Sequence, residues 1–119
     1  MFVSDIYYDY PRAKAFEIVG QLNEPDMFYE FNTLAVFRHK PTGIMWYAIS
    51  SGCSCPIPFE EYYVNYENLE SDMDEINHRT FKTFKKEVMA FCAKGDRYHS
   101  TIPLDERKAL VEKVRGLLK

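Results

Sequence analysis

Long apolar runs are missing from this sequence, and cysteine is scarce. The two longest apolar runs, 44–49 and 88–93, have six residues each, whereas a membrane-spanning helix needs about 18 or more. The residues from Met1 to Asp5 show neither the basic region nor the apolar stretch of a signal peptide. Three cysteines cannot form a closed set of disulfides, which favours a reducing compartment. We therefore expect a cytoplasmic protein without a transmembrane helix.

Motifs that mark an enzyme or a cofactor site are also missing. The sequence has no glycine-rich phosphate loop, and Asn77 stands where the turn glycine of an EF-hand would fall. None of the three histidines has a serine or cysteine at a spacing typical of nucleophilic catalysis. An enzyme would have to assemble its site from scattered residues, so we expect a non-enzymatic protein without a cofactor.

Apolar residues make up 46% of the 119 residues, which is enough for one packed domain over 1–119. Alternation over 15–22, with Phe16, Ile18, Gly20 and Leu22 on one face, predicts a strand. A second strand is predicted over 27–40 and a third over 44–50, joined by a hairpin turn at 39–43 that contains Pro41 and Gly43. Apolar residues on both faces of the second strand indicate a central position.

Helical patterns follow the strands. Ser71 and Asp74 have the spacing of a capping box, which predicts a helix from Ser71 to Lys94–Gly95. Another helix is predicted after Pro103, because residues 110, 111, 114, 117 and 118 form one apolar stripe. Its cations are expected on the solvent side: Arg107, Lys108, Lys113 and Arg115. The expected fold is thus α+β, a small antiparallel meander of about three strands over 15–50 followed by two C-terminal helices packed on one face.

The segment Ser51–Pro56 contains two cysteines one residue apart, Cys53 and Cys55. Such a pair supplies two of the four ligands of a zinc site. No second closely spaced pair accompanies it, so the fold would have to bring in Cys92 or a histidine. The alternative is a compact turn of small side chains, since cysteine often serves as a small buried apolar residue.

Charge is distributed unevenly along the chain. Residues 1–77 hold 13 acidic and four basic residues, whereas residues 78–119 hold five acidic and 11 basic ones. Solvated faces explain most such blocks. Two nucleic-acid hypotheses stay open: a basic helical face formed by Arg79, Lys82 and Lys86, and an acidic DNA mimic formed by the first part.

Tyrosines interleaved with acidic residues predict a protein-binding surface. Tyrosine offers an apolar ring with a polar tip, which suits interfaces. We expect the contact on one acidic-aromatic cluster, formed by Glu60, Glu61, Tyr62, Tyr63 and Tyr66. The expected partner is another protein, with a homodimer as an alternative.

The segment Ser51–Glu60, SGCSCPIPFE, resembles a family of small uncharacterised accessory proteins of actinobacterial, including mycobacterial, phages. The resemblance extends back through 16–20, 34–38 and 42–43, and so covers roughly residues 15–61. That family has no assigned activity, cofactor or catalytic residue. The resemblance implies a phage accessory protein that acts in the bacterial cytoplasm. Together with the small size, the acidic tyrosine-rich cluster and the lack of catalytic motifs, it leads us to expect a host or phage protein as the partner.

Overall fold

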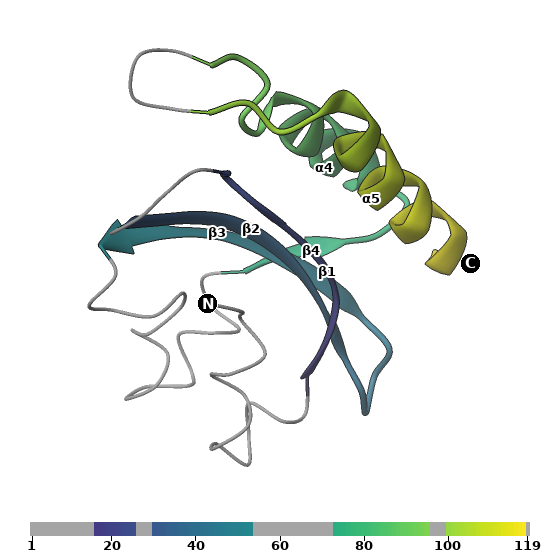
Figure 1. Ribbon diagram of the computed structural model, residues 1–119. Coiled ribbons are helices and arrows are strands. Elements are labelled where there is room, and N and C mark those ends of the chain that lie inside the picture. The colour runs from purple at the N-terminus through teal and green to yellow at the C-terminus, as the bar shows by residue number, and fades with distance from the viewer. Residues whose placement is uncertain (1–15, 26–29, 54–72, 96–99, 119) are drawn as a thin grey trace.

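The computed structural model describes residues 16–25, 30–53, 73–95 and 100–118. In these residues four strands form one antiparallel sheet in the order β1-β2-β3-β4, and two helices cover one of its faces (Figure 1). The elements are β1 (Phe16–Asn23), β2 (Glu30–His39), β3 (Met45–Cys53), β4 (Asp74–Ile76), α4 (Phe81–Ala90) and α5 (Leu104–Leu117). This confirms the predicted α+β class with its two C-terminal helices; the described sheet has one more strand than expected.

The predicted hairpin joins β2 to β3. The two strands pair from Glu30 opposite Cys53 to Arg38 opposite Met45. Gly43 has a φ of +74°, which glycine adopts without steric cost. The backbone N–H of His39 donates to the carbonyl of Ile44 over 2.8 Å, which closes the turn.

Strand β1 contains an irregularity that the sequence did not predict. The register with β2 shifts between Ile18 and Gly20, as in a β-bulge. Val19, placed on the opposite face by simple alternation, therefore joins Leu22 in the core. Phe16 instead contacts the rings of Phe37 and His39.

The predicted start of the first helix is wrong. Asp74, assigned to a capping box, belongs to β4, which pairs with β3, and Ser71 lies outside the described residues. The side-chain oxygen of Asn77 accepts hydrogen bonds from the N–H groups of Arg79 and Thr80 at 2.9 and 3.0 Å. Helix α4 therefore begins only at Phe81. The backbone before this turn pairs with β3 as strand β4, so its N–H and C=O groups are not available for helical hydrogen bonds.

The first helix also ends earlier than predicted. It ends at Ala90, and Cys92 has a φ of +50°, which no helix can accommodate. The carbonyl of Cys92 accepts a hydrogen bond from Ile102, the buried residue just before α5. The chain thus turns back at Cys92 instead of continuing to Lys94–Gly95.

The core lies between the sheet and the helices. Leu34 and Val36 from β2 and Tyr47 from β3 pack against a helical layer formed by Phe84, Val88, Leu110, Val111 and Val114. Ala35 and Phe37 of β2 are fully buried as well, so both faces of this strand are covered. Its inner position in the sheet is confirmed.

Arg107 was expected to face solvent, but it is only 7% exposed. Its guanidinium donates to two backbone carbonyls, those of Ile102 and Met89. Met89 lies in the last turn of α4, where carbonyls have no partner within the helix. Arg107 is buried because it satisfies the Met89 carbonyl, which the end of α4 leaves open, and the Ile102 carbonyl before α5.

Gly20 allows α5 to approach β1 closely. A Cβ atom at Gly20 would lie 2.7 Å from Cδ1 of Leu110, a residue that is itself buried. We expect Gly20→Ala to lower the free energy of unfolding by about 1 kcal/mol or more, because the buried leucine must shift. Urea denaturation measures this change.

Gly116 provides the matched control, since no atom lies within 4 Å of a Cβ atom placed there. Gly116→Ala in α5 should leave stability unchanged or raise it by up to about 1 kcal/mol. Equal effects of the two substitutions would contradict the steric explanation for Gly20.

Candidate functional site

Most residues that the sequence singled out for binding lie outside the described residues. These are Glu60, Glu61, Tyr62, Tyr63, Tyr66 and Cys55. Cys53 closes β3 opposite Glu30, so strand pairing continues into the segment that was expected to form a turn. Within the described ranges, no three His, Cys, Asp or Glu residues gather as a metal site would require. The zinc site at Cys53 and Cys55 stays a prediction.

The basic residues of the predicted nucleic-acid face are described and exposed. Arg79 precedes α4, and Lys82 and Lys86 lie on it. None of the three side chains forms an ion pair with a described residue. The predicted single helical face is wrong for Arg79, because the helix begins two residues after it; Lys82 and Lys86 remain exposed on α4.

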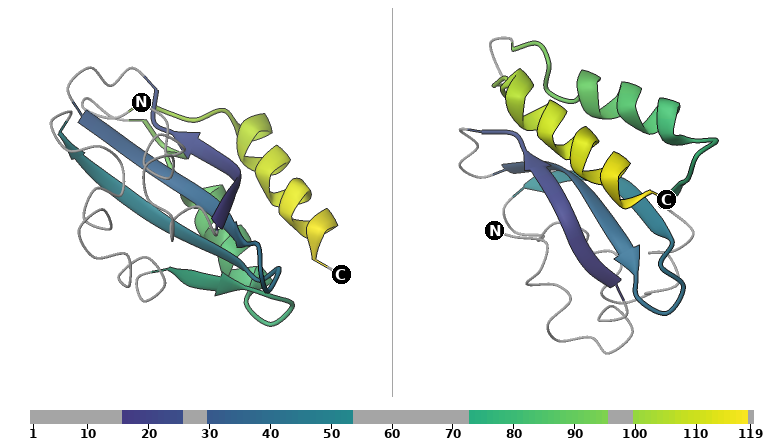
Figure 2. Two further views of the ribbon diagram at one scale, coloured as in Figure 1. Left: turned by 90° about the horizontal axis from the view of Figure 1, so that it is seen from below. Right: turned by 90° about the vertical axis from the view of Figure 1, so that its right-hand side faces the viewer.

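A groove of about 450 Å³ lies between the outer edge of β1 and helix α5. One wall is the strand itself, from Gly20 to Asn23, and the other is α5, with Glu106, Ala109, Leu110 and Lys113. Figure 2 shows α5 on the outer side of β1, opposite the side on which β2 pairs. The strand edge and the helix thus face a common space.

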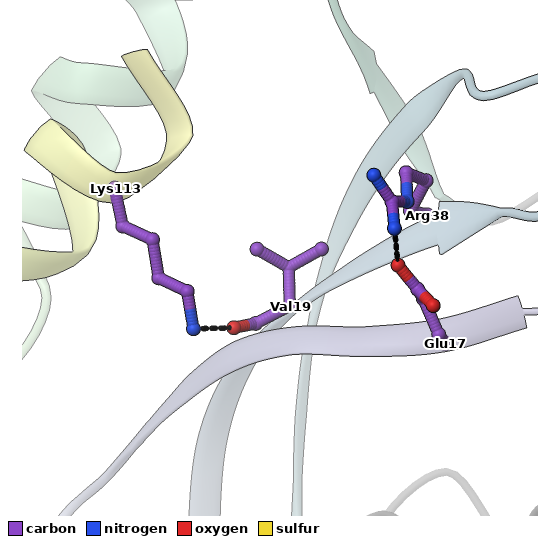
Figure 3. Close-up of polar contacts among 4 residues, drawn as sticks. All are labelled: Glu17, Val19, Arg38 and Lys113. Atoms are coloured by element: carbon purple, nitrogen blue, oxygen red, sulfur yellow. Dashed lines mark hydrogen bonds and ion pairs between the residues drawn. The ribbon is translucent and has the colours of Figure 1, made fainter. Parts of the chain in front are cut away.

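Lys113 ties α5 to the bulge in β1. Its Nζ donates a hydrogen bond to the carbonyl oxygen of Val19 over 2.5 Å (Figure 3). Beyond the bulge, Glu17 forms an ion pair with Arg38 directly across the strands (Figure 3). A bulge and a lysine are two devices that limit pairing at a sheet edge, so this part of the edge is protected.

From Gly20 onward the edge of β1 has no strand partner among the described residues. The N–H of Glu24 donates to the carbonyl of Asn32 in β2 over 2.9 Å. Backbone groups of an antiparallel strand point alternately toward and away from its neighbour. Those of Leu22 therefore point toward β2, and those of Gln21 and Asn23 point into the groove. No strand of the described chain pairs with this side of β1.

Opposite charges stand at the two ends of the groove. Lys113 lies at the Val19 end and Leu110 packs at Gly20, so α5 runs antiparallel to β1. Glu106, one turn before Leu110, therefore lies toward Asn23. Ala109 and Leu110 provide an apolar wall between the two charges.

The sequence did not single out Gln21, Glu106 or Lys113 for binding. Its helical pattern predicts Lys113 only as one of several solvent-facing cations of the last helix. The available signal was Gly20, because a glycine inside a strand pattern marks a bulge or a close backbone approach. Which helix approaches Gly20 is decided by tertiary contacts, which the strand pattern does not encode.

A buried polar cluster closes the far end of β1. Glu24, only 7% exposed, accepts hydrogen bonds from the Asn32 amide at 3.3 Å and the Cys92 thiol at 3.4 Å. These contacts join the end of β1 to the turn after α4. Cys92 is thus a hydrogen-bonded residue just after the end of α4.

Burial, together with the hydrogen bond to Glu24 and its charge, raises the pKa of the Cys92 thiol to about 12. A thiol acts as a nucleophile or metal ligand in its deprotonated form. At neutral pH Cys92 therefore stays protonated and donates to the carboxylate. The cluster has a structural role.

The described helices offer no segment that is both long and apolar enough to cross a membrane. What the described residues define is a small α+β domain with an open sheet edge beside a helix. Residues 4–113 match a domain of unknown function, DUF7574. The match covers most of the chain, which therefore belongs to this family. Neither the curated proteins nor the solved structures contain a match.

The Cys92 thiol makes stability depend on alkaline pH. An ordinary thiol has a pKa of about 8.5, so the unfolded chain releases this proton first as the pH rises. The stabilisation is complete below about pH 8.5 and is lost progressively as the pH approaches 12. Cys92→Ser keeps a donor for Glu24 but does not titrate.

We expect the free energy of unfolding to fall more steeply above pH 9 in the native sequence than in Cys92→Ser. The difference in slope is at most about 1.4 kcal/mol per pH unit, the value for one proton. Tyr47, whose pKa burial and Glu87 also raise, titrates in both proteins. Urea denaturation from pH 8 to 11 gives the slopes, and identical slopes would contradict the assignment.

Proposed function

We propose that this protein is a non-enzymatic phage accessory protein that binds another protein through the groove between β1 and α5. The supporting observation is the outward-facing backbone of Gln21 and Asn23 beside that groove. An open strand edge binds an extended segment of a partner through main-chain hydrogen bonds. The resemblance of Ser51–Glu60 to phage proteins supports the phage origin and a place in the bacterial cytoplasm.

The acidic-aromatic cluster of Glu60, Glu61, Tyr62, Tyr63 and Tyr66 remains a second proposed contact surface, which lies outside the described residues. The partner is a host or phage protein.

Selection from random nine-residue peptides displayed on yeast tests this function. Gln21→Pro removes an N–H group that points away from β2, so pairing within the sheet is retained. Gln21→Ala changes the same side chain and keeps the N–H. We expect selected peptides to bind the native protein and Gln21→Ala, and to lose at least tenfold in affinity for Gln21→Pro.

Circular dichroism and thermal unfolding establish that both variants fold. Peptides that bind Gln21→Pro as tightly as Gln21→Ala would contradict recognition through the strand edge. A selection without any binding peptide would count against the groove as a protein-binding site.

Nucleic-acid binding by the basic residues at the start of α4 and in the turn before it is a second candidate. The exposure of Arg79, Lys82 and Lys86, without ion pairs to described residues, supports it. Lysine and arginine contacts to phosphates make binding strongly salt-dependent.

Fluorescence anisotropy with labelled duplex DNA tests the basic face. Replacing all three residues by alanine should weaken binding and reduce the slope of log affinity against log salt by about 0.9 for each phosphate that the variant no longer neutralises. Alanine at Lys40, Lys94 and Lys108, which are also exposed, is the matched control. Equal effects of the two triple variants would rule out a specific role for this face.

A further inference from the structure

The groove beside β1 has a volume of about 450 Å³ and is lined on one side by the strand from Gly20 to Asn23. Its floor is the edge of β1, where Gln21 and Asn23 present N–H and C=O groups, and α5 stands over it on the outer side (Figure 2). A segment that pairs with this edge lies about 4.8 Å from β1. It then lies alongside Ala109 and Leu110 of α5.

A second copy of the chain fits this space poorly. Two β1 strands paired about a twofold axis perpendicular to the sheet would carry both α5 helices to the same face, above the same junction. Each α5 extends beyond the edge of its own β1 (Figure 2). The strands would be about 4.8 Å apart, whereas packed helices need about 8–10 Å between their axes. A bare extended segment avoids this overlap.

The charges of the groove define the chemistry of that segment. Glu106 and Lys113 are seven residues apart on α5, which corresponds to about 10.5 Å along a helix. In a strand, residues i and i+4 are about 13.5 Å apart and lie on the same face, together with i+2. One strand can therefore present a basic residue to Glu106, an apolar residue to Ala109 and Leu110, and an acidic residue to Lys113.

Lys113 keeps capacity for a carboxylate. Its ammonium group has three N–H donors, and the carbonyl of Val19 accepts one of them. A carboxylate beside it can accept another without breaking the contact that holds α5 to the bulge.

The order of the charges follows from the strand direction. A segment antiparallel to β1 begins near Asn23 and Glu106 and ends near Lys113. Antiparallel pairing is also slightly more stable per residue than parallel pairing. The basic residue then comes first in the partner, and the acidic residue comes four positions later.

On this basis we infer that the groove binds an extended partner segment, antiparallel to β1, with the pattern basic-x-apolar-x-acidic. The inference rests on the proposed function and specifies the partner. The basic side chain pairs with Glu106, the apolar one packs on Ala109 and Leu110, and the acidic one pairs with Lys113.

Three blocked, fluorescein-labelled peptides test the pattern, each with the motif between glycines: KTVTE, the reversed ETVTK and the neutral QTVTQ. Fluorescence anisotropy measures their affinity for the whole protein at low salt. We expect KTVTE to bind about tenfold more tightly than ETVTK, since each exposed ion pair contributes modestly. QTVTQ should fall between them.

A charge-reversal variant sharpens the test. Glu106→Lys combined with Lys113→Glu should invert the preference, so that ETVTK binds about tenfold more tightly than KTVTE. Asp105→Lys combined with Lys108→Glu makes the same change of charge on exposed α5 residues that do not line the groove, and should keep the native preference. Thermal unfolding verifies that both variants fold.

Each other outcome overturns the inference in a recognisable way. Equal affinity for all three peptides, abolished in Gln21→Pro, would refute the charge pattern and leave strand-edge binding intact. Tighter binding of ETVTK to the native protein would refute the antiparallel direction. A concentration-dependent dimer that Gln21→Pro abolishes would identify a second copy as the occupant. Peptide binding unaffected by Gln21→Pro would refute the proposed function itself.

Discussion

The close approach of α5 to β1 is the constraint on which much of this structure depends. The bulge between Ile18 and Gly20 brings Val19 into the core, next to the place where Gly20 leaves room for Leu110. A side chain at Gly20 would collide with the terminal methyl group of Leu110, which would have to shift. The same bulge turns the carbonyl of Val19 toward Lys113, which holds α5 on the outer side of β1. The bulge in β1 therefore contributes both to core packing and to the position of α5 beside the groove.

Polar groups fix the ends of the elements that the core brings together. Arg107 satisfies a carbonyl in the last turn of α4, and the Cys92 thiol donates to the buried carboxylate of Glu24. Both contacts lie near the turn between α4 and α5, at the far end of β1. A buried polar group is costly unless it has a partner, so these contacts favour one arrangement of helices over the sheet.

An open strand edge can pair with other chains, so it favours aggregation as well as specific binding. In β1 the bulge and Lys113 protect one part of the edge, and α5 overhangs the rest. Within the described residues, the backbone groups that stay unpaired on this edge belong to Gln21 and Asn23. A short extended segment of a partner could pair with them. A helix above the edge also adds side-chain selectivity to main-chain pairing, since its charges and its apolar wall meet alternate residues of the incoming strand.

Local patterns determined the fold class and the identity of most elements. The hairpin at Gly43 and the apolar stripe of α5 are encoded within a few residues, because turn conformation and helical periodicity are local properties. The helix limits could not be predicted this way. Asp74 and Ile76 fit a helix start equally well, and only pairing with Met45 and Tyr47 makes them a strand.

From the sequence alone, three strands followed by two helices could be predicted, whereas the fourth strand, β4, could not. The sequence also contains few cysteines and no motif for known chemistry. Only the tertiary structure decided that Arg107 is buried, that Cys92 donates to Glu24, and that Lys113 and Glu106 flank an open strand edge. The physical reason is separation along the chain. Lys113 and Val19 are 94 residues apart in sequence, and Cys92 and Glu24 are 68 apart. Contacts at such separations depend on how α5 and the turn after α4 pack against β1, which no local pattern encodes.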